Sequence, residues 1–244
     1  MNDNNQNISD IELIFEDDYL VVVNKPNNLL VHHSHYARNI QEASMMELLN
    51  STNTELHLIH RLDRKTSGII LLVKKKEYIS AFQKLFQTSL ITKNYLAVVR
   101  GYTDDEGKID SPIRIDESDK YKNALTHFKT LAKIELKNFP VHPYHTSRYS
   151  LVMLSPKTGR QHQLRKHMNK ISHPIIGDHK YGDRFHNRNF ETNFGLSNLF
   201  LHAHELIFEH PFLNKKLHLS AKLPDNWSIL LNKFNWTISL NDQL

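Results

Sequence analysis

The sequence of 244 residues contains no cysteine, which excludes disulfide bonds, thiolate metal sites and a cysteine nucleophile. It has no apolar run long enough for a membrane-spanning helix, and residues 1–10 lack the basic and apolar regions of a signal peptide. It also has no phosphate-binding P-loop, no dinucleotide-binding glycine motif and no histidine pair with the spacing of a zinc hydrolase site. We therefore expect a cytoplasmic protein without a metal or nucleotide cofactor.

Glycine is scarce as well, with seven residues in the chain. Glycine tolerates left-handed backbone and close approach better than any other residue, so its placement is informative when it is rare. Five of the seven lie in dense polar motifs: Gly68, Gly101, Gly159, Gly177 and Gly182.

Positive charge is concentrated in one part of the chain. The net charge is +5, but residues 157–188 alone carry eight Lys or Arg residues against two Asp residues, a net of +6. Residues 1–18 carry six acidic residues and no Lys or Arg. A local basic stripe of this kind is the electrostatic footprint of nucleic-acid binding. The alternative is a solvated basic face.

The hydrophobic pattern predicts many strands with scattered helices, which is typical of an α+β fold. The predicted strands span residues 11–15, 19–23, 69–73, 95–99, 113–115, 124–136, 149–154, 199–208 and 217–219. The predicted helices span residues 41–49, 77–86, 160–168 and 227–234. Residues 103–123 resemble a polar loop and residues 182–198 an insertion. We expect a polar tail over residues 1–10 and a single domain over residues 11–244.

The most informative motif is the segment from His60 to Gly68, which precedes a predicted buried strand. It places one carboxylate, Asp63, among the cations Arg61, Arg64 and Lys65, with His60 as a possible further cation. A carboxylate among guanidinium groups stays ionised and suits a nucleophile or an electrostatic anchor. Arginine side chains are also well shaped to bind phosphates. The alternative is an exposed charged turn with a surface ion pair.

A second motif covers residues 158–167. Thr158 can cap a helix on which Arg160, Leu164 and His167 share one face and Arg165 lies on another. A basic helix N-terminus after a glycine suits phosphate binding, whereas a basic surface helix is the alternative.

A third motif places Tyr95 near the start of an apolar strand. Such a tyrosine is usually a core residue, but its ring can also stack on a nucleic-acid base.

Taken in order, these motifs resemble the RluA family of pseudouridine synthases. The resemblance spans about residues 11–224 and includes residues 25–32, with Asn28 where the family often has glycine, and residues 174–178 and 201–203. Residues 146–149, 156–165, 173–178 and 193–196 narrow it to a subfamily that isomerises a uridine in the T-stem of tRNA, at tRNA position 65. The predicted start of the first strand by Ile11 agrees with that subfamily, which has no N-terminal S4-type RNA-binding domain.

The resemblance implies a pseudouridine synthase fold, with a central mostly antiparallel mixed β-sheet, flanking helices and a catalytic cleft. It implies that Arg61 fills the space left by the flipped base and that Asp63 acts on the nucleotide. Tyr95 would stack on the base, Leu164 would pack against its other face, and Arg165 would pair with Asp63. Whether Asp63 attacks the sugar, attacks the base or assists formation of a glycal stays open.

The predicted RNA-binding residues also include His60, Arg64, Arg160 and Lys166. The partner implied is tRNA, with no metal, cofactor, membrane or protein partner, and a monomer is expected. Two alternatives remain: an enzyme of the same family that acts on ribosomal RNA, and a non-catalytic RNA-binding module. Binding alone would not require Asp63, Tyr95 and Arg165 together, which argues against the second. A metal-dependent nuclease would need a carboxylate cluster that the sequence lacks.

Overall fold

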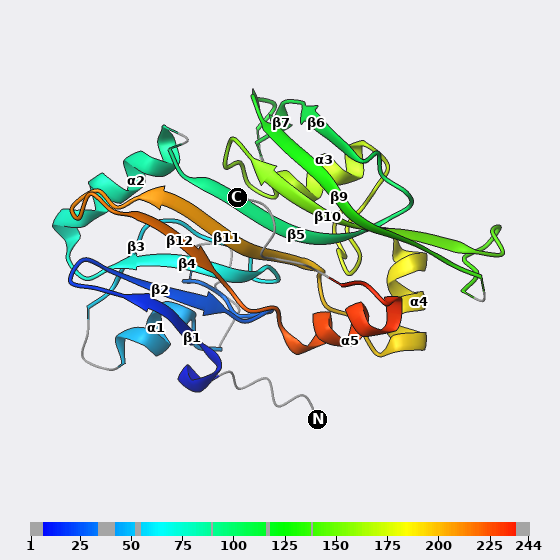
Figure 1. Ribbon diagram of the computed structural model, residues 1–244, viewed down its shortest axis with the longest axis horizontal. Coiled ribbons are helices and arrows are strands. Elements are labelled where there is room, and N and C mark those ends of the chain that lie inside the picture. The colour runs from blue at the N-terminus through cyan, green and yellow to red at the C-terminus, as the bar shows by residue number, and fades with distance from the viewer. Residues whose placement is uncertain are drawn as a thin grey trace. The chain divides into compact units, whose positions relative to one another are not determined.

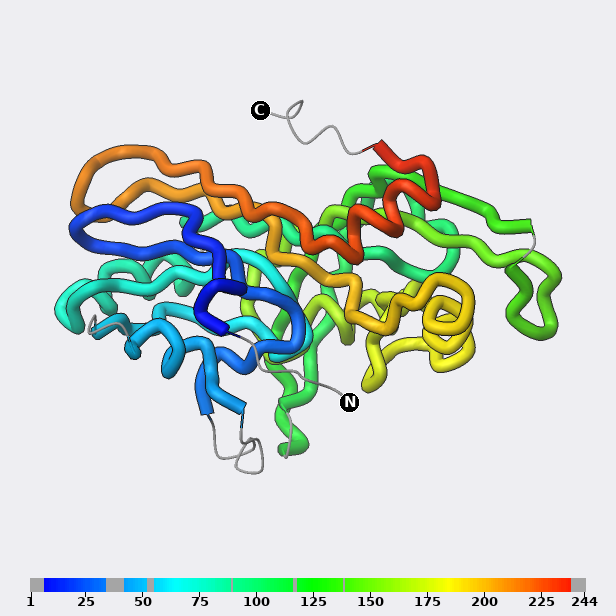
Figure 2. Tube along the Cα trace, turned by 90° about the horizontal axis from the view of Figure 1, so that it is seen from below, coloured from blue at the N-terminus to red at the C-terminus, as the bar shows by residue number. Residues whose placement is uncertain are grey.

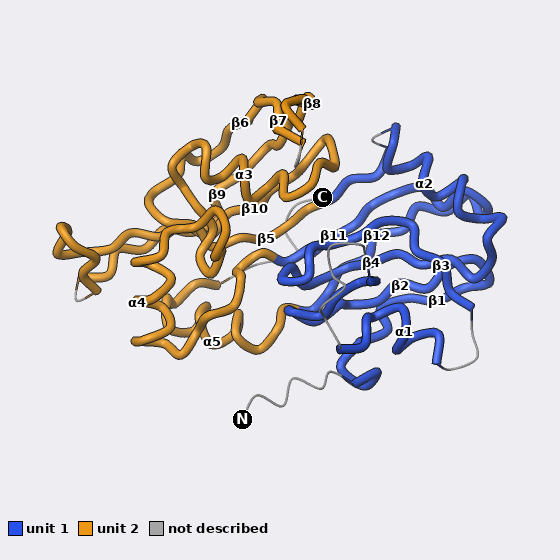
Figure 3. The backbone as a smooth tube through the Cα atoms, turned by 180° about the vertical axis from the view of Figure 1, so that it is seen from behind, with its two compact units in different colours: residues 1–93, 202–222 blue, residues 94–201, 223–244 orange. Residues whose placement is uncertain are grey.

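The computed structural model describes residues 7–33, 42–51, 55–88, 90–115, 118–137 and 139–237. The chain forms two compact units (Figure 3). Unit 1 comprises residues 1–93 and 202–222, and unit 2 comprises residues 94–201 and 223–244. Neither unit is a continuous piece of the sequence. The prediction of a single domain over residues 11–244 stays a prediction.

Unit 1 is built on strands that lie side by side in the order β1-β2-β4-β11-β12, with β3 also paired to β4 (Figure 1). The β4–β11 pairing is parallel and the others are antiparallel. The strands are β1 (Glu12–Glu16), β2 (Leu20–Lys25), β3 (His57–Leu58), β4 (Ser67–Val73), β11 (Leu201–Glu209) and β12 (Lys216–Ser220). The helices are η1 (Ile8–Asp10), α1 (Met45–Asn50), η3 (Lys76–Tyr78) and α2 (Ile79–Gln87).

The sequence explains why these strands form. Every residue of β4 is buried, as its continuous apolar run predicts for a strand covered on both faces. The turn between β1 and β2 is closed by Asp17, whose Oδ1 accepts hydrogen bonds from the backbone N–H groups of Tyr19 and Leu20, both at 2.8 Å. Phe82 and Leu85 of α2 pack into the same core as β2 and β4. The predicted strands at residues 11–15, 19–23 and 69–73 are confirmed.

Gly68 allows β4 and β11 to approach closely. Its φ is +112°, and a Cβ atom at this position would lie 2.1 Å from the carbonyl oxygen of Ala203, its partner in β11. No other residue type fits this backbone without displacing the neighbouring strand. The glycine that ends the Asp63 motif is therefore a structural requirement of the sheet in unit 1.

Unit 2 contains an antiparallel sheet in the order β5-β10-β9-β6, and β7 pairs with β8 in a separate hairpin. The strands are β5 (Thr92–Arg100), β6 (Glu106–Asp110), β7 (Ile113–Arg114), β8 (Tyr121–Lys122), β9 (Leu125–Leu136) and β10 (Ser147–Pro156). The helices are α3 (Gln163–Lys170), α4 (Arg184–Phe194) and α5 (Asp225–Phe234). The loop that follows β9 turns back beside α4 (Figures 1 and 2).

Two hydrophobic clusters hold unit 2 together. One is largely aromatic and joins α4 and α5 through Phe190, Trp227 and Phe234. The other packs Leu164 and Met168 of α3 against strands of the sheet. Both place helices on the sheet in the way that an α+β fold requires.

Three predictions need correction. The segment 103–123 was expected to be a loop with one short strand, but it contains β6 and the β7–β8 hairpin. The predicted insertion over residues 182–198 contains helix α4, which begins after Asp183. The side chain of Asp183 caps this helix by accepting hydrogen bonds from the backbone N–H groups of Phe185 and His186. The helix predicted over residues 41–49 begins at Met45, and Gln41 lies outside the described residues. Within the described part of the chain, no helix is both long and apolar enough to cross a membrane.

Candidate functional site

Asp63 lies in a turn of unit 1 that leads into β4. The backbone N–H of Thr66 donates to the carbonyl oxygen of Asp63 at 3.0 Å. Leu62 and Thr66 are buried on either side, whereas Asp63 itself is partly exposed. The backbone hydrogen bond and the two buried neighbours thus anchor the turn that carries Asp63.

A buried lysine ties this turn to the one that follows β2. The Nζ atom of Lys25 donates to the carbonyl oxygens of Pro26, Leu29 and Arg64, at 2.8, 2.9 and 3.0 Å. Lys25 is fully buried. Burial lowers its pKa to about 7, although the negative charge of Asp63 acts in the opposite direction. Because Arg64 follows Asp63 directly, Lys25 fixes the backbone of the aspartate turn.

Of the arginines around Asp63, Arg64 is held by other groups of the protein. Arg64 donates from Nε to the carbonyl oxygen of Asn28 at 3.0 Å and forms an ion pair with Glu42. Asn28 has a φ of +66°, a left-handed conformation that asparagine tolerates. Arg61, in contrast, is exposed.

His60 is not a cation in this structure. Its Nε2 accepts a hydrogen bond from the backbone N–H of Leu71 at 3.0 Å, and its ring stacks on Phe86 with 4.6 Å between centroids. Burial, aided by the charge of Lys93, lowers the pKa of His60 to about 3. The possible charge predicted for His60 is therefore wrong near pH 7, because an imidazole that accepts a backbone N–H must be neutral. A role of His60 in RNA binding stays a prediction.

Arg165 belongs to unit 2 and forms a bidentate ion pair with Asp178. Its Nε lies 2.7 Å from Oδ2 and its Nη2 lies 2.8 Å from Oδ1 of that carboxylate. Both side chains are buried. A guanidinium has five N–H donors, so these two bonds leave further donors for other partners.

Tyr95 and Leu164 contribute to one hydrophobic cluster of unit 2. Tyr95 lies opposite Leu154 in the β5–β10 ladder and packs, partly buried, against the cluster that contains Leu164. Tyr95 and Leu164 therefore belong to the same cluster, and their contact with one base stays a prediction. Arg165 follows Leu164 directly and is the buried cation of the same helix.

The start of α3 differs from the prediction. The helix begins at Gln163 after His162, which has a left-handed backbone conformation, so Thr158 does not cap it. Instead, the Gln163 side chain accepts from the Thr158 hydroxyl at 2.7 Å and from the Arg160 backbone N–H at 3.0 Å. Because Arg160 precedes the helix, the prediction that Arg160 shares a helical face with Leu164 and His167 is wrong.

The two remaining predicted RNA-binding residues also lie in unit 2. Arg160 is exposed and donates from Nε to the carbonyl oxygen of Asn123 at 3.1 Å. The Nζ of Lys166 lies 3.3 Å from the carbonyl oxygen of Arg114 and 5.8 Å from the centre of the Tyr181 ring. Both retain partial exposure, as phosphate-binding residues need.

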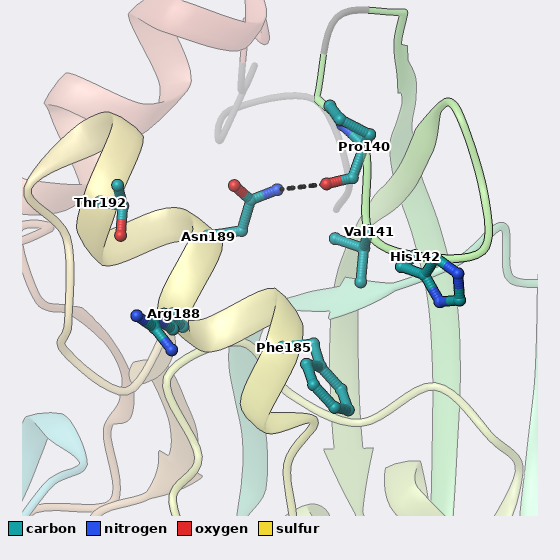
Figure 4. Close-up of a pocket in the computed structure, with 7 residues that line it drawn as sticks. All are labelled: Pro140, Val141, His142, Phe185, Arg188, Asn189 and Thr192. Carbon is teal, nitrogen blue, oxygen red and sulfur yellow. Dashed lines mark hydrogen bonds between the residues drawn. The ribbon is translucent and has the colours of Figure 1, made fainter.

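A separate hollow lies between α4 and the loop over residues 139–146 (Figure 4). Its volume is about 240 Å³, and it is open to solvent. It is lined by Pro140, Val141, His142, Phe185, Arg188, Asn189 and Thr192. None of the predicted site residues lines this hollow. Within the described ranges, no three His, Asp or Glu side chains gather into a candidate metal site.

Sequence reasoning missed the roles of Lys25 and Asp178. In the sequence, Lys25 looks like part of a polar turn. Only its position at the buried end of β2 distinguishes it from an ordinary surface lysine. Asp178 stands in one of the resembling segments without an assigned role. Neither contact is visible in the sequence, because each depends on partners 13 or more residues away, Arg64 for Lys25 and Arg165 for Asp178.

Comparison with known proteins agrees with the motifs. A family model described as RNA pseudouridylate synthase matches residues 19–170. The tRNA pseudouridine synthase C of Haemophilus ducreyi is 40% identical over 236 residues, which cover 93% of this chain and 97% of the relative. The enzyme of the same name from Pasteurella multocida is 39% identical, with 94% and 98% covered.

Solved structures confirm the fold. Human RNA Pseudouridylate Synthase Domain Containing 4 superposes with a TM-score of 0.71 at 28% identity, covering 92% of this chain and 93% of the human chain. Human RNA Pseudouridylate Synthase Domain Containing 1, at 22% identity and a TM-score of 0.70, supports the fold alone. The predictions of an α+β pseudouridine synthase fold and of an isomerase are confirmed: the chain belongs to the RNA pseudouridylate synthase family.

Proposed function

We propose that this protein converts a uridine of tRNA into pseudouridine, and that the uridine is the one at tRNA position 65, in the T-stem. The supporting observation is the similarity to relatives named tRNA pseudouridine synthase C, which are about 40% identical over nearly the whole of both chains. The choice of uridine follows from the motif resemblance. We expect the enzyme to act as a monomer in the cytoplasm, where tRNA is found.

The reaction first requires the uridine to leave the stem. Extruding a base costs a few kcal/mol, which contacts to the opened RNA must offset. Arg61 is exposed at the start of the aspartate segment and carries a planar guanidinium. Such a group can stack between bases and contact phosphates at the same time. We assign it the space that the flipped base leaves.

Asp63 then acts on the flipped nucleotide. The reaction breaks the bond between C1′ and N1 of the uridine and joins C1′ to C5; the proton that leaves C5 is balanced by one gained at N1. A carboxylate serves this chemistry only if it is ionised and held in place. The Lys25 bonds to the backbone of the aspartate turn support such a role.

Three further residues are assigned roles from the motif resemblance. Tyr95 stacks on the base, and Leu164 packs against its other face; their shared cluster supports this assignment. Arg165 pairs with Asp63 and keeps it anionic. Arg64, Arg160 and Lys166, with His60, are assigned to the RNA-binding surface.

The experiment compares the wild-type protein with Asp63→Asn on a tRNA transcript. We expect Asp63→Asn to abolish pseudouridine formation and to leave the dissociation constant for tRNA within about threefold, because the carboxylate acts on the reacting nucleotide. Asp18→Asn is the matched control: it removes the same charge from an exposed turn of unit 1 and should keep full activity.

Full activity of Asp63→Asn would contradict the assignment of the catalytic residue. A wild-type protein that binds tRNA without forming pseudouridine would instead favour the non-catalytic RNA-binding module. Activity on ribosomal RNA but not on tRNA would favour the other alternative.

A further inference from the structure

The carboxylate of Asp178 is fixed by more than its ion pair with Arg165. Its Oδ1 also accepts hydrogen bonds from the backbone N–H groups of Lys180 and Tyr181, at 2.9 and 3.0 Å. Burial alone would raise the pKa of Asp178, but these bonds and the charge of Arg165 hold it below its usual value. The carboxylate of Asp178 is thus held by the backbone of its own loop through Oδ1 and by Arg165 through both oxygens.

This loop, residues 177–182 (the Asp178 loop), is held by helix α4. The side-chain oxygen of Asn187 accepts from the backbone N–H of Gly177 at 2.8 Å, and its amide nitrogen donates to the carbonyl oxygen of Asp178 at 2.9 Å. A Cβ atom at Gly182 would lie 2.1 Å from that same carbonyl oxygen. One side chain of α4 therefore brackets the residue that binds Arg165.

The ring of Tyr181 covers the guanidinium of Arg165. The Arg165 Cζ lies 5.1 Å from the ring centroid, within the range of a cation–π interaction. The Tyr181 hydroxyl is hydrogen-bonded to Nδ1 of His162, at 2.9 Å, just before α3. The plane of the guanidinium is therefore constrained as well as its position.

We propose that Asp178, bracketed by Asn187 of α4, is a positioning residue that holds the guanidinium of Arg165 in its reactive orientation. The inference rests on the proposed function of Arg165. A free arginine side chain has several rotatable bonds, whereas two parallel hydrogen bonds to a fixed carboxylate leave its planar group one orientation. Helix α4, which the sequence presents as an insertion, thereby acts on the reaction through Asp178 and Arg165.

The experiment measures pseudouridine formation in a tRNA transcript with enzyme in excess and with saturating substrate, and separately the dissociation constant for tRNA. In Asp178→Asn, one amide N–H₂ faces the donors of Arg165, so the bidentate pair is lost. We expect the rate of the chemical step to fall about 100-fold, as for a misplaced catalytic group, with tRNA affinity changed by less than about threefold. Asn187→Ala should lower the same rate about tenfold.

Asn189→Ala is the matched control. Asn189 lies on the same helix and donates to the carbonyl oxygen of Pro140 at 3.3 Å, in the hollow away from the Asp178 loop (Figure 4). Its replacement should leave the rate within about twofold of the wild-type value, since distant sites act independently. Loss of rate in Asn189→Ala equal to that in Asn187→Ala would overturn the role of Asn187 as a specific bracket.

A double-mutant cycle separates positioning from general stability. Arg165→Lys keeps the positive charge but cannot form the bidentate pair. If Asp178 acts through Arg165, Asp178→Asn should cost less than about threefold in rate in the Arg165→Lys background. An equal cost in both backgrounds would overturn the inference, and so would a wild-type rate for Asp178→Asn.

A second readout does not depend on activity. The Nε–H resonance of Arg165, assigned by its absence in Arg165→Lys, should exchange slowly with water in the wild-type protein and in Asn189→Ala, and rapidly in Asp178→Asn and Asn187→Ala. A rapidly exchanging resonance in the wild-type protein would overturn the inference. A slowly exchanging one in a wild-type protein that forms no pseudouridine would refute the proposed function and, with it, the catalytic part of the inference.

Discussion

Replacing Lys25 with methionine removes a buried amine that fixes the aspartate turn. Methionine keeps a long, unbranched side chain of similar size, so the change removes the donor with little change in packing. The carbonyl oxygens of Pro26, Leu29 and Arg64 each lose a hydrogen bond. The bond to Leu29 is fully buried, whereas the other two are only partly buried.

The structure gives the size of the effect. An unsatisfied buried acceptor costs about 1–3 kcal/mol, and a partly exposed one costs less because water can replace the donor. Near pH 9 the uncharged amine of Lys25 has two N–H donors for these acceptors, so we expect Lys25→Met to lower the free energy of unfolding by about 2–4 kcal/mol there. A typical total of about 5–15 kcal/mol makes a loss of this size readily measurable.

The sign of the pH dependence follows from the lowered pKa of Lys25. Its pKa is about 7 in the folded protein, against 10.5 for an unperturbed lysine. Between these values the unfolded chain binds more protons than the folded one, so the stability contributed by Lys25 rises with pH. It is complete above pH 10.5 and is lost as the pH falls towards 7. The advantage of the wild-type protein over Lys25→Met should therefore grow by about 2 kcal/mol between pH 7 and 9.

Urea unfolding of both proteins at pH 7, 8 and 9 measures this difference. Groups other than Lys25 titrate in both proteins and cancel when the two free energies are subtracted. A difference that stays constant from pH 7 to 9 would refute the lowered pKa of Lys25. Equal stability of the two proteins at pH 9 would refute the claim that hydrogen bonds from Lys25 hold the turn.

Three further predictions concern charge and packing. Replacing Lys166 and Lys170 with alanine should weaken tRNA binding and reduce the slope of log K against log salt by about 0.7–0.9 per lost phosphate contact, and an unchanged slope would contradict contact of these two lysines with RNA phosphates. Arg165→Met should lower the free energy of unfolding by about 3–5 kcal/mol because it leaves Asp178 buried and charged. Urea unfolding should show that adding Asp178→Asn to Arg165→Met recovers most of the lost free energy of unfolding. No recovery would contradict the buried ion pair. Gly68→Ala should cost at least about 2 kcal/mol in the same assay, and a change below about 0.5 kcal/mol would contradict the close packing of β4 on β11.

The hydrophobic pattern of a segment predicted its helix or strand correctly where contacts with distant residues do not change that element. The run from Ile69 to Val73 is apolar throughout because β4 is covered on both faces, and it was recognised on that basis. Strand β6 was missed because most of Glu106–Asp110 is polar and only Ile109 is buried, so neither an apolar run nor a clear alternation marks it. The late start of α3 was missed because the Gln163 side chain binds the Arg160 backbone and replaces the expected cap.

The sequence named candidate site residues but not the contacts that hold them in place. The motif around Asp63 and the resemblance it carries were sufficient to name Asp63, Tyr95 and Arg165. The bonds of Lys25 to the aspartate turn and of Asp178 to Arg165 join separate motifs, and no local pattern encodes them. The neutral state of His60 likewise depends on the Leu71 backbone and the Phe86 ring, which only the folded chain brings to it.

The central claim is that Asp63 isomerises a uridine of tRNA. The most direct measurement maps pseudouridine in the tRNA and ribosomal RNA of cells that lack this protein, and of the same cells supplied with the wild-type or the Asp63→Asn protein. We predict that one pseudouridine of the tRNA T-stem disappears without the protein, returns with the wild-type protein and does not return with Asp63→Asn. Loss of a ribosomal RNA pseudouridine with tRNA intact, or restoration by Asp63→Asn, would contradict the account.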